Sequence, residues 1–500
     1  MFRRHPRVLV ICAAVLLLAA GCGWLAPVAV PDPIPAATLW PAVPPTRLPT
    51  TAPTRVPSPL PTPTAHPPEP ATLPATLTPL PGPTPQGSPE PPDVLGSGVS
   101  ITFWHSLEPA SPAGGLLAAQ IAEFEQIYPQ ISVEATFVGS PALLHRAMLL
   151  AIAEEVWPDL AMSPPEALAE YVGKGAVAPL DPFLSDPELG LAAASWEDLL
   201  PGARRLGLLF QNGAQRYALP FALSATGLWY NQDLLEQAGR AAPPRTWAEF
   251  EDACLAVAAS TGQVGYGYVP SGRLVAAWFT GRGVPLLSED GDRAAFATPA
   301  GAEALALLAR LRAAGAAREY ATDQEALQAF AEGHVALLIG STGVTAELHR
   351  LVAGAEQGVA AWGQEPLPGE EGTDGATLLT GSALFGLRTD TLHETAAWLL
   401  IRFLSEPRQA AAWGRVGYLP VRTSAGVLLA DQYARSPVLR QQVERLAPRG
   451  VPAPAISCLG EVEDYLLEAL LAVRDGSASP ENALTRAASL ADAALAVRCR

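Results

Sequence analysis

Residues 99–104, Val-Ser-Ile-Thr-Phe-Trp, alternate hydrophobic and polar side chains and include a high share of β-branched and aromatic residues. This pattern predicts a β-strand. Hydrophobic residues then recur at helical spacing over 116–124, and Pro129 ends the predicted helix. Residues 131–137 predict a second strand. A strand, a helix and a strand at this spacing favour a parallel sheet, so the sequence predicts an α/β protein.

The same alternation of helix and strand continues along the chain, without an internal repeat. Thr246-Trp-Ala-Glu249 has the form of a capping box, which marks the start of a helix. Further helices are predicted over 142–155, 165–174, 247–261, 299–314 and 392–404, and further strands over 159–162, 227–230 and 336–339.

The N-terminus has the features of an export signal. Arg3, Arg4 and Arg7 precede 13 hydrophobic residues, 8–20, which are too few to span a bilayer. Small residues directly before Cys22 resemble the bacterial lipobox, in which the cysteine is acylated. We therefore expect a signal peptide over 1–21 and lipidation at Cys22, with ordinary secretion as the alternative. The protein would be anchored to the outer face of the cytoplasmic membrane, on the periplasmic side if an outer membrane exists.

A proline-rich linker follows the predicted anchor. The chain has 51 prolines, and 24 of them lie within residues 27–92. Such a segment cannot pair its backbone into a core, so 22–98 is predicted to be a disordered Pro/Thr-rich linker. The folded part is then 99–500, which is long enough for one large or two coupled α/β units.

Composition excludes some functions and leaves others open. The net charge is −17, which argues against nucleic acid as a partner. No nucleophile elbow, phosphate loop or zinc-protease motif is present, so an enzyme is not expected, and neither is a metal or cofactor. Three cysteines remain after the signal and anchor, and we favour a disulfide between Cys458 and Cys499 over three unpaired thiols, with Cys254 left free.

Several stretches, in their order and spacing, resemble bacterial extracellular solute-binding proteins of family 1, the sugar-binding components of ABC importers. The most specific are 228–235, Leu-Trp-Tyr-Asn-Gln-Asp-Leu-Leu, and 243–250, Pro-Pro-Arg-Thr-Trp-Ala-Glu-Phe. One departure is Ser382, where family members often have glycine, and no motif is matched after about residue 426. The other matching stretches are 101–106, 124–129, 131–137, 157–160, 178–181, 217–220, 333–340, 366–368, 403–407 and 417–422.

The resemblance implies a two-lobe fold of the periplasmic-binding-protein type II class, with a central cleft and hinge crossovers. Lobe 1 would hold about 99–222 and 368–408, and lobe 2 about 223–367 and 409–500. The protein, expected to be a monomer, would capture a carbohydrate between the lobes and deliver it to the permease subunits of an ABC importer. The alternatives are a polyol phosphate or polyamine on the same fold, a surface sensor or adhesion module, and a secreted hydrolase.

The resemblance and the strand ends also suggest ligand contacts. Trp104 and His105 end the first strand, at the edge where parallel sheets bind ligands. Aromatic rings would stack on sugar faces, and hydroxyl or guanidinium groups would bind sugar hydroxyls. Structural roles in cores, turns and helix caps are the alternative for each residue. The candidates are Trp104, His105, Trp278 with Phe279, Trp362 and Tyr418, together with Ser140, Ser163, Ser382 and Arg422. If Trp104 and Trp278 stack on sugar, replacing both with alanine should weaken binding at least roughly tenfold and leave the melting temperature almost unchanged.

Overall fold

The computed structural model describes residues 98–206, 215–356 and 358–498. The predicted signal peptide, Cys22, nearly all of the linker and Cys499 lie outside the described residues, so the predictions made for them stay predictions.

The described strands form one sheet in the order β2-β1-β3-β9-β4-β7-β5-β6, with β10 added beside β9 and β8 beside β4. β1 pairs in parallel with β2 and β3, as the opening sequence pattern predicted. β9 and β4 run antiparallel to each other in the middle of the sheet. The strands are β1 (Val99–His105), β2 (Ile131–Phe137), β3 (Leu160–Ser163), β4 (Leu219–Asn231), β5 (Val264–Tyr268), β6 (Ala317–Glu319), β7 (Val335–Ser341), β8 (Trp362–Glu365), β9 (Thr377–Gly386) and β10 (Gly450–Pro452).

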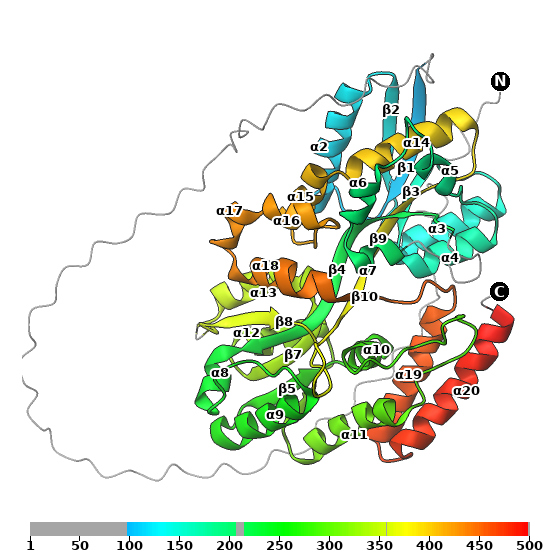
Figure 1. Ribbon diagram of the computed structural model, residues 1–500. Coiled ribbons are helices and arrows are strands. Elements are labelled where there is room, and N and C mark those ends of the chain that lie inside the picture. Colours follow the sequence, from blue (N-terminus) through cyan, green and yellow to red (C-terminus); the bar gives the residue numbers. More distant parts are fainter. Residues whose placement is uncertain (1–97, 207–214, 357, 499–500) are drawn as a thin grey trace, which may run out of the picture. The chain divides into compact units, whose positions relative to one another are not determined.

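Helices connect the strands (Figure 1). The helices predicted over 142–155, 165–174, 247–261, 299–314 and 392–404 are confirmed within two residues at each end, and the helix predicted around 116–124 extends from Pro112 to Ile127. The capping box between Thr246 and Glu249 is present at the start of α9. The helices are α2 (Pro112–Ile127), α3 (Pro141–Ala153), α4 (Pro165–Gly173), α5 (Asp181–Leu184), α6 (Ala193–Glu197), α7 (Pro201–Arg205), α8 (Gln232–Gln237), α9 (Trp247–Thr261), α10 (Gly272–Gly281), α11 (Pro299–Ala313), α12 (Asp323–Ala331), α13 (Thr345–Gly354), α14 (Thr391–Leu404), α15 (Pro407–Arg415), α16 (Thr423–Val427), α17 (Ala430–Tyr433), α18 (Pro437–Gln441), α19 (Leu459–Arg474) and α20 (Pro480–Arg498).

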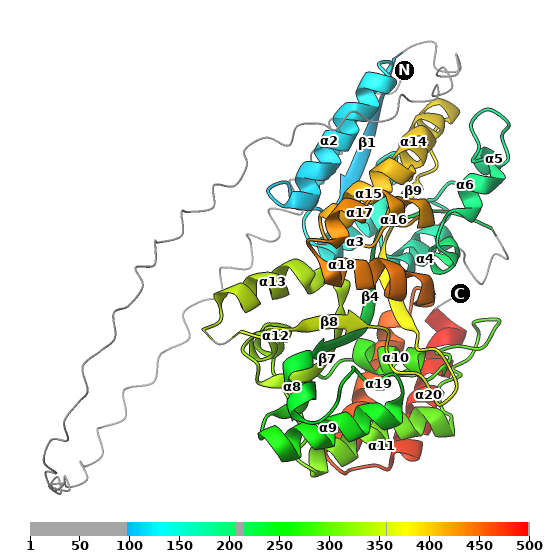
Figure 2. The ribbon, with the colours of Figure 1, turned by 60° about the vertical axis from the view of Figure 1, so that its left-hand side comes forward.

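Two large hydrophobic cores divide the folded part. Core 1 draws its buried residues from 99–222 and 383–413, with Ala455. Core 2 draws them from 228–378 and 456–495. We call the parts built around these cores lobe 1 and lobe 2. Figure 2 shows the long strands β4 and β9 side by side between the helices of the two lobes.

The chain returns to lobe 1 later than the resemblance suggested. Leu378 belongs to core 2 and Ala383 to core 1, so the return crossing lies within β9 rather than near residue 368. Trp413 lies in core 1, although residues from 409 onward were expected in lobe 2. A smaller third core gathers residues of 410–447 around Leu223 and Leu379 of the crossing strands.

The two crossing strands are irregular at their centre. The register of β4 against β9 shifts between Pro220 and Leu223, and Leu223 lies opposite Gly381. Gly381 has a φ of 130°, a conformation that is essentially open only to glycine. A bulge bends and twists a strand locally. Together with β10, which pairs with residues 377–379, this bulge forms the hinge region between the lobes.

We predict that Gly381→Ala destabilises the protein by about 3 kcal/mol. An added Cβ would lie 2.2 Å from the Ala222 carbonyl oxygen, and the backbone would be strained by its positive φ. Chemical denaturation measures the loss. Gly460→Ala in α19 is the control, because nothing lies within 4 Å of its added Cβ. Equal stability of the two variants would contradict the strained geometry of the crossing.

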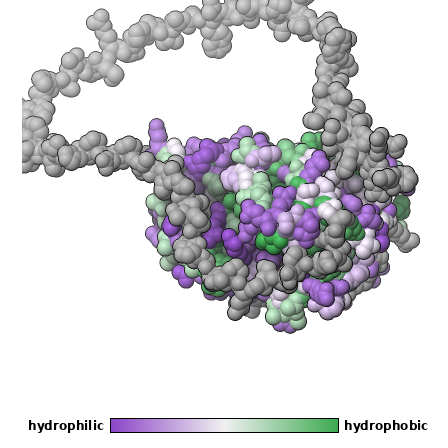
Figure 3. Space-filling view, turned by 90° about the horizontal axis from the view of Figure 1, so that it is seen from above, coloured by the Kyte–Doolittle hydropathy of each residue, from purple (hydrophilic) through white to green (hydrophobic). Residues whose placement is uncertain are grey.

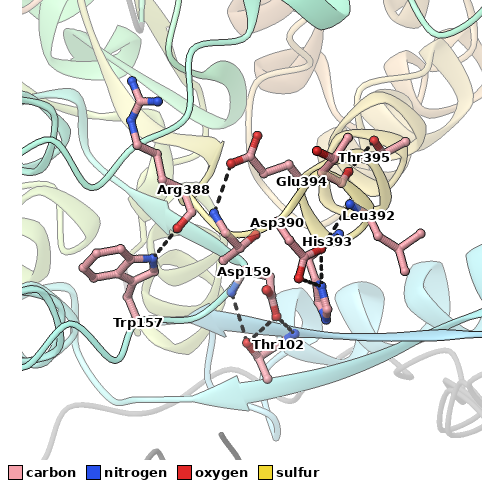
Figure 4. A network of polar contacts seen from close by, with 11 residues as sticks. Thr102, Trp157, Asp159, Arg388, Asp390, Leu392, His393, Glu394 and Thr395 are labelled. Carbon is pink, nitrogen blue, oxygen red and sulfur yellow. Dashed lines mark hydrogen bonds and ion pairs between the residues drawn. The ribbon is translucent and has the colours of Figure 1, made fainter. Parts of the chain in front are cut away.

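Several polar contacts lie near the amino-terminal end of β3 and the start of α14 (Figure 4), among them a hydrogen bond from Trp157 Nε1 to the Arg388 carbonyl at 2.9 Å. The Asp159 carboxylate accepts hydrogen bonds from the Thr102 backbone N–H and hydroxyl, each at 2.9 Å. Asp390 caps α14 by accepting from the backbone N–H groups of Leu392 and His393. Asp159 and Asp390 therefore have hydrogen-bond partners within lobe 1, at the end of β3 opposite to its carboxyl end.

Hydrophilic residues cover much of the face seen in Figure 3, with smaller hydrophobic areas between them.

Candidate ligand-binding site

The carboxyl ends of parallel strands in both lobes lead into helix starts. In lobe 1, β3 ends at Ser163 and α4 begins at Pro165. In lobe 2, β5 ends at Tyr268 and Ser271 caps the start of α10 by accepting from the Leu274 N–H. Open α/β sheets bind ligands at such edges, beside the helix starts.

A cavity of about 180 Å³ lies where these two helix starts meet the hinge. Lobe 1 contributes the start of α4, and lobe 2 contributes Arg273. The crossing strand β9 contributes residues 379–381. The lining residues are Pro164, Pro165, Glu166, Leu206, Arg273, Leu379, Thr380, Gly381 and Ala453.

An ion pair crosses this cavity. The Arg273 guanidinium lies 3.7 Å from the carboxylate of Glu166, and its Nε lies 2.8 Å from that of Glu463 on α19. The glycine at position 272 allows the start of α10 to lie close to α19, because a Cβ there would lie 1.9 Å from the Glu463 carbonyl oxygen. Burial raises the pKa of Glu463, and the nearby Arg273 partly offsets that shift.

The lining also includes one hydroxyl residue, Thr380. Ser224 pairs with Thr380 across the crossing strands, and the Thr380 hydroxyl donates to the Ser224 carbonyl at 3.5 Å. At the end of β7, the hydroxyls of Ser224 and Ser341 both lie 3.4 Å from where a Cβ on Gly343 would be. Carboxylate, guanidinium and hydroxyl groups together can donate to and accept from the hydroxyls of a polar solute.

Trp104 and Trp278 lie in the cores of the lobes. Their exposed fractions are 0% and 3%. Trp278 donates from Nε1 to the Tyr266 hydroxyl at 3.2 Å and packs against Trp247. Phe279 is also fully buried. Trp104, Trp278 and Phe279 are therefore core residues in this conformation, which is the structural alternative given for them in the sequence analysis. None of the three rings exposes a face on which a sugar could stack.

The other predicted rings occupy different parts of the molecule. His105 is buried, accepts from the Leu107 N–H at 3.3 Å, and burial lowers its pKa. Trp362 is half-buried in lobe 2 beside Trp229. Tyr418 is half-buried and packs edge-on against Trp413. None of these predicted rings lines the 180 Å³ cavity.

The predicted polar residues divide into two groups. Ser140 caps α3 by accepting from the Leu143 N–H, and Arg422 is buried among backbone acceptors. Ser163 directly precedes the cavity residue Pro164, and Ser382 directly follows Gly381. Neither Ser163 nor Ser382 is itself among the lining residues, and the Ser163 hydroxyl donates to the Pro164 carbonyl. Ser140 and Arg422 have structural partners away from the cavity lining.

Glu166, Arg273 and Thr380 were not singled out from the sequence as ligand contacts. Glu166 lies in the first turn of α4, directly after β3, and this position could have identified it as a candidate ligand contact. Phe137 was also overlooked: it ends β2, packs near His105 and is 40% exposed, so its ring has a free surface at the carboxyl edge of lobe 1.

The cysteines agree in part with the sequence analysis. Cys458 takes part in a disulfide bond, and Cys254 is a buried free thiol. The favoured partner Cys499 lies outside the described residues, so that pairing stays a prediction. Among the described residues, no helix combines the length and hydrophobicity needed to cross a bilayer.

The chain belongs to the bacterial extracellular solute-binding proteins, whose sequence profile matches residues 109–411, more than half of its length. A relative from Brucella abortus (strain 2308), described as a binding protein, is 26% identical over 384 residues, which are 74% of this chain and 88% of the relative.

Solved structures share the fold. The sugar-binding protein MalE from Xanthomonas citri matches with a TM-score of 0.70 and 22% identity, over 80% of this chain and 98% of that chain. A cyclic alpha-maltosyl-1,6-maltose binding protein from Arthrobacter globiformis matches at 0.69 and 20%, over 80% and 99%. A Mycobacterium tuberculosis protein in complex with glycerophosphocholine matches at 0.62 and 20%, over 80% and 99%. At these identities the likeness establishes the two-lobe fold.

Proposed function

We propose that this protein is the carbohydrate-binding component of an ABC importer. It captures a sugar between its lobes and delivers it to the membrane permease without chemical turnover. The observation that carries the proposal is the cavity at the hinge, which takes its lining from both lobes and combines Glu166, Arg273 and Thr380. A ligand there contacts both lobes at once, so it favours the closed arrangement over the open one.

Two of the structural neighbours bind sugars according to their descriptions, and one was solved with glycerophosphocholine. The first two support a carbohydrate, and the third keeps a polyol phosphate as the second candidate. Thr380 and Arg273 in the lining can bind the hydroxyl groups of either solute, so a binding measurement has to distinguish the two.

The proposed setting is the outer face of the cytoplasmic membrane. The acylated Cys22 anchors the chain, and the Pro-rich segment up to residue 98 separates the anchor from the folded part. Phe137 is proposed as an additional aromatic contact for a longer sugar, because it combines exposure with a place at the carboxyl edge of lobe 1.

A thermal-shift screen tests the proposal with mono- and oligosaccharides, polyols, sugar phosphates and polyamines. A ligand at about 100 times its dissociation constant should add about 2.7 kcal/mol of stability, which is a shift of several degrees. We expect hits among the carbohydrates. Hits only among phosphates or polyamines would replace the sugar by another solute, and no hit in the panel would favour a sensor or adhesion role. Release of hydrolysis products would contradict a pure binding function.

A further inference from the structure

A second cavity, of about 40 Å³, shares no lining residue with the cavity between the lobes. It lies where the residues directly before α9, the loop from β8 to β9 and the segment before β10 meet. A buried water needs roughly 10–15 Å³ of such space, so the cavity has room for about three waters or one small ion. We call it the arginine pocket, because its charged lining residues are Arg245, Arg445 and Arg449, with Glu365 and Asp374.

The lining of the arginine pocket is positively charged in a protein that is strongly negative. Three guanidinium groups and two carboxylates give the lining a formal charge of +1, whereas the whole chain has −17. The Glu365 side chain is 8% exposed and lies 2.5 Å from Arg445 Nη1. Burial raises the pKa of Glu365, and the charges of Arg445, Arg449 and Arg245 each lower it. All three guanidinium groups are therefore close enough to act on one buried carboxylate.

The two carboxylates use only a part of the hydrogen-bond donors that these arginines carry. Each guanidinium has five N–H groups. Arg445 Nη1 donates to Glu365, and Arg449 Nη1 donates to the Arg445 carbonyl at 3.0 Å. Asp374 lies 3.8 Å from Arg449 Nη2, beyond hydrogen-bond distance, and its side chain is 74% exposed. The Arg245 guanidinium has no hydrogen-bond or ion-pair partner among the described residues, and only its backbone N–H donates, to Glu249.

We propose that the arginine pocket is a binding site for a phosphate group, held by Arg245, Arg445 and Arg449 and separate from the solute cleft. Guanidinium groups stay charged and bind the oxygens of phosphate in a bidentate way. A singly charged phosphate would balance the +1 of the lining. The cavity has room for the phosphate group alone, so free phosphate is the expected ligand, and an ester would bind with the rest of its molecule outside the pocket.

The bound anion would join lobe 2 to the hinge region. Arg245 directly precedes the N-cap of α9 in lobe 2. Arg449 ends the short 3₁₀ helix η6 (Ala447–Arg449), directly before β10, and β10 pairs with the crossing strand β9. Because the unfolded chain does not bring these arginines together, phosphate should bind only the folded protein and stabilise it.

Isothermal titration of the full chain with inorganic phosphate, at constant ionic strength, tests the proposal. The wild type should bind one phosphate per chain, and phosphate should raise its melting temperature by a few degrees. Arg245→Gln/Arg449→Gln keeps the pair of Arg445 and Glu365 and should bind phosphate at least about tenfold more weakly. If this double variant does not fold, Arg245→Gln alone should show a smaller loss. A second titration with glycerol 3-phosphate distinguishes an ester from the free ion.

The matched control is Arg293→Gln/Arg350→Gln, which removes two arginines of lobe 2 that are 70% and 67% exposed and lie outside the pocket. It should bind phosphate as the wild type does. Binding of glycerol 3-phosphate alone, lost in the pocket variant, would support the site with an ester as its ligand.

Three results would overturn the inference: no saturable binding of either phosphate compound, unchanged binding in the pocket variant, or an equal loss in the control. Phosphate binding that is lost in Arg273→Gln and kept in the pocket variant would place the anion in the cleft, and it would also contradict the arginine pocket. The proposed function fails separately, because carbohydrate binding is measured without phosphate and depends on other residues.

Discussion

Trp278→Ala is expected to lower the free energy of unfolding by about 3–5 kcal/mol, because it removes a large ring from a close-packed core. Trp278 is 3% exposed, contacts Trp247 and Phe250, and donates to the Tyr266 hydroxyl. The variant would leave a cavity among these rings and the Tyr266 hydroxyl without its donor.

Urea denaturation measures this loss, and Phe137→Ala serves as the control. Phe137 is 40% exposed, so its removal should change stability by less than about 1 kcal/mol. The expectation reverses the stacking hypothesis drawn from the sequence, in which loss of this tryptophan weakens sugar binding and spares stability. Normal stability together with lost sugar binding would restore the stacking role.

Arg422→Ala is expected to cost about 3–5 kcal/mol, since it removes one side of a buried charge network. The guanidinium is 1% exposed and donates to the backbone carbonyls of Ser195 and Ser405. It also lies 3.5 Å from the carboxylate of Asp198. These contacts hold the segment after Tyr418 against lobe 1, and without them the two carbonyls and the carboxylate lose a donor.

The control for this prediction is Arg350→Ala, which removes an exposed arginine paired with Glu347 on the same helix and should have no measurable effect. Both variants are compared by the midpoint of chemical denaturation. An Arg422 variant as stable as the control would contradict the structural role and make a ligand role for this residue worth testing again.

Local patterns in the sequence were sufficient for much of the fold. β1, β2 and the helix between them follow from side-chain periodicity, and α9 from the pairing of Thr246 with Glu249. β5 was not predicted, because two of its five residues are glycines. Gly265 is needed there since a Cβ would lie 2.4 Å from the Cys254 carbonyl oxygen, a tertiary contact that no local pattern contains.

The candidate site was harder to predict than the fold. Alternation shows that the side of β1 with Val99, Ile101 and Phe103 is buried. Trp104 lies on the other side, after the exposed Ser100, and alternation does not show that this side becomes buried at the end of the strand. Arg273 follows the unpredicted β5, so its place at the cleft could not be inferred. Its pairing with Glu166 joins two lobes, and a contact between residues 107 positions apart depends on how the lobes pack.

The sequence resemblance and the cavity agree on where a solute should bind, and they differ on the residues. The resemblance drew attention to aromatic rings, most of which the structure places in cores or on the lobes away from the cavity. The cavity instead presents charged and hydroxyl groups from both lobes and the hinge. A solute recognised there is bound mainly through its hydroxyl groups.

Isothermal titration of a carbohydrate found in the screen, into the wild type and Arg273→Ala, tests the central claim most directly. The account predicts that the variant binds at least about tenfold more weakly, a loss of about 1.4 kcal/mol or more, while its melting temperature stays within a few degrees of the wild type. Unchanged affinity would show that the sugar binds elsewhere than in the cavity between the lobes.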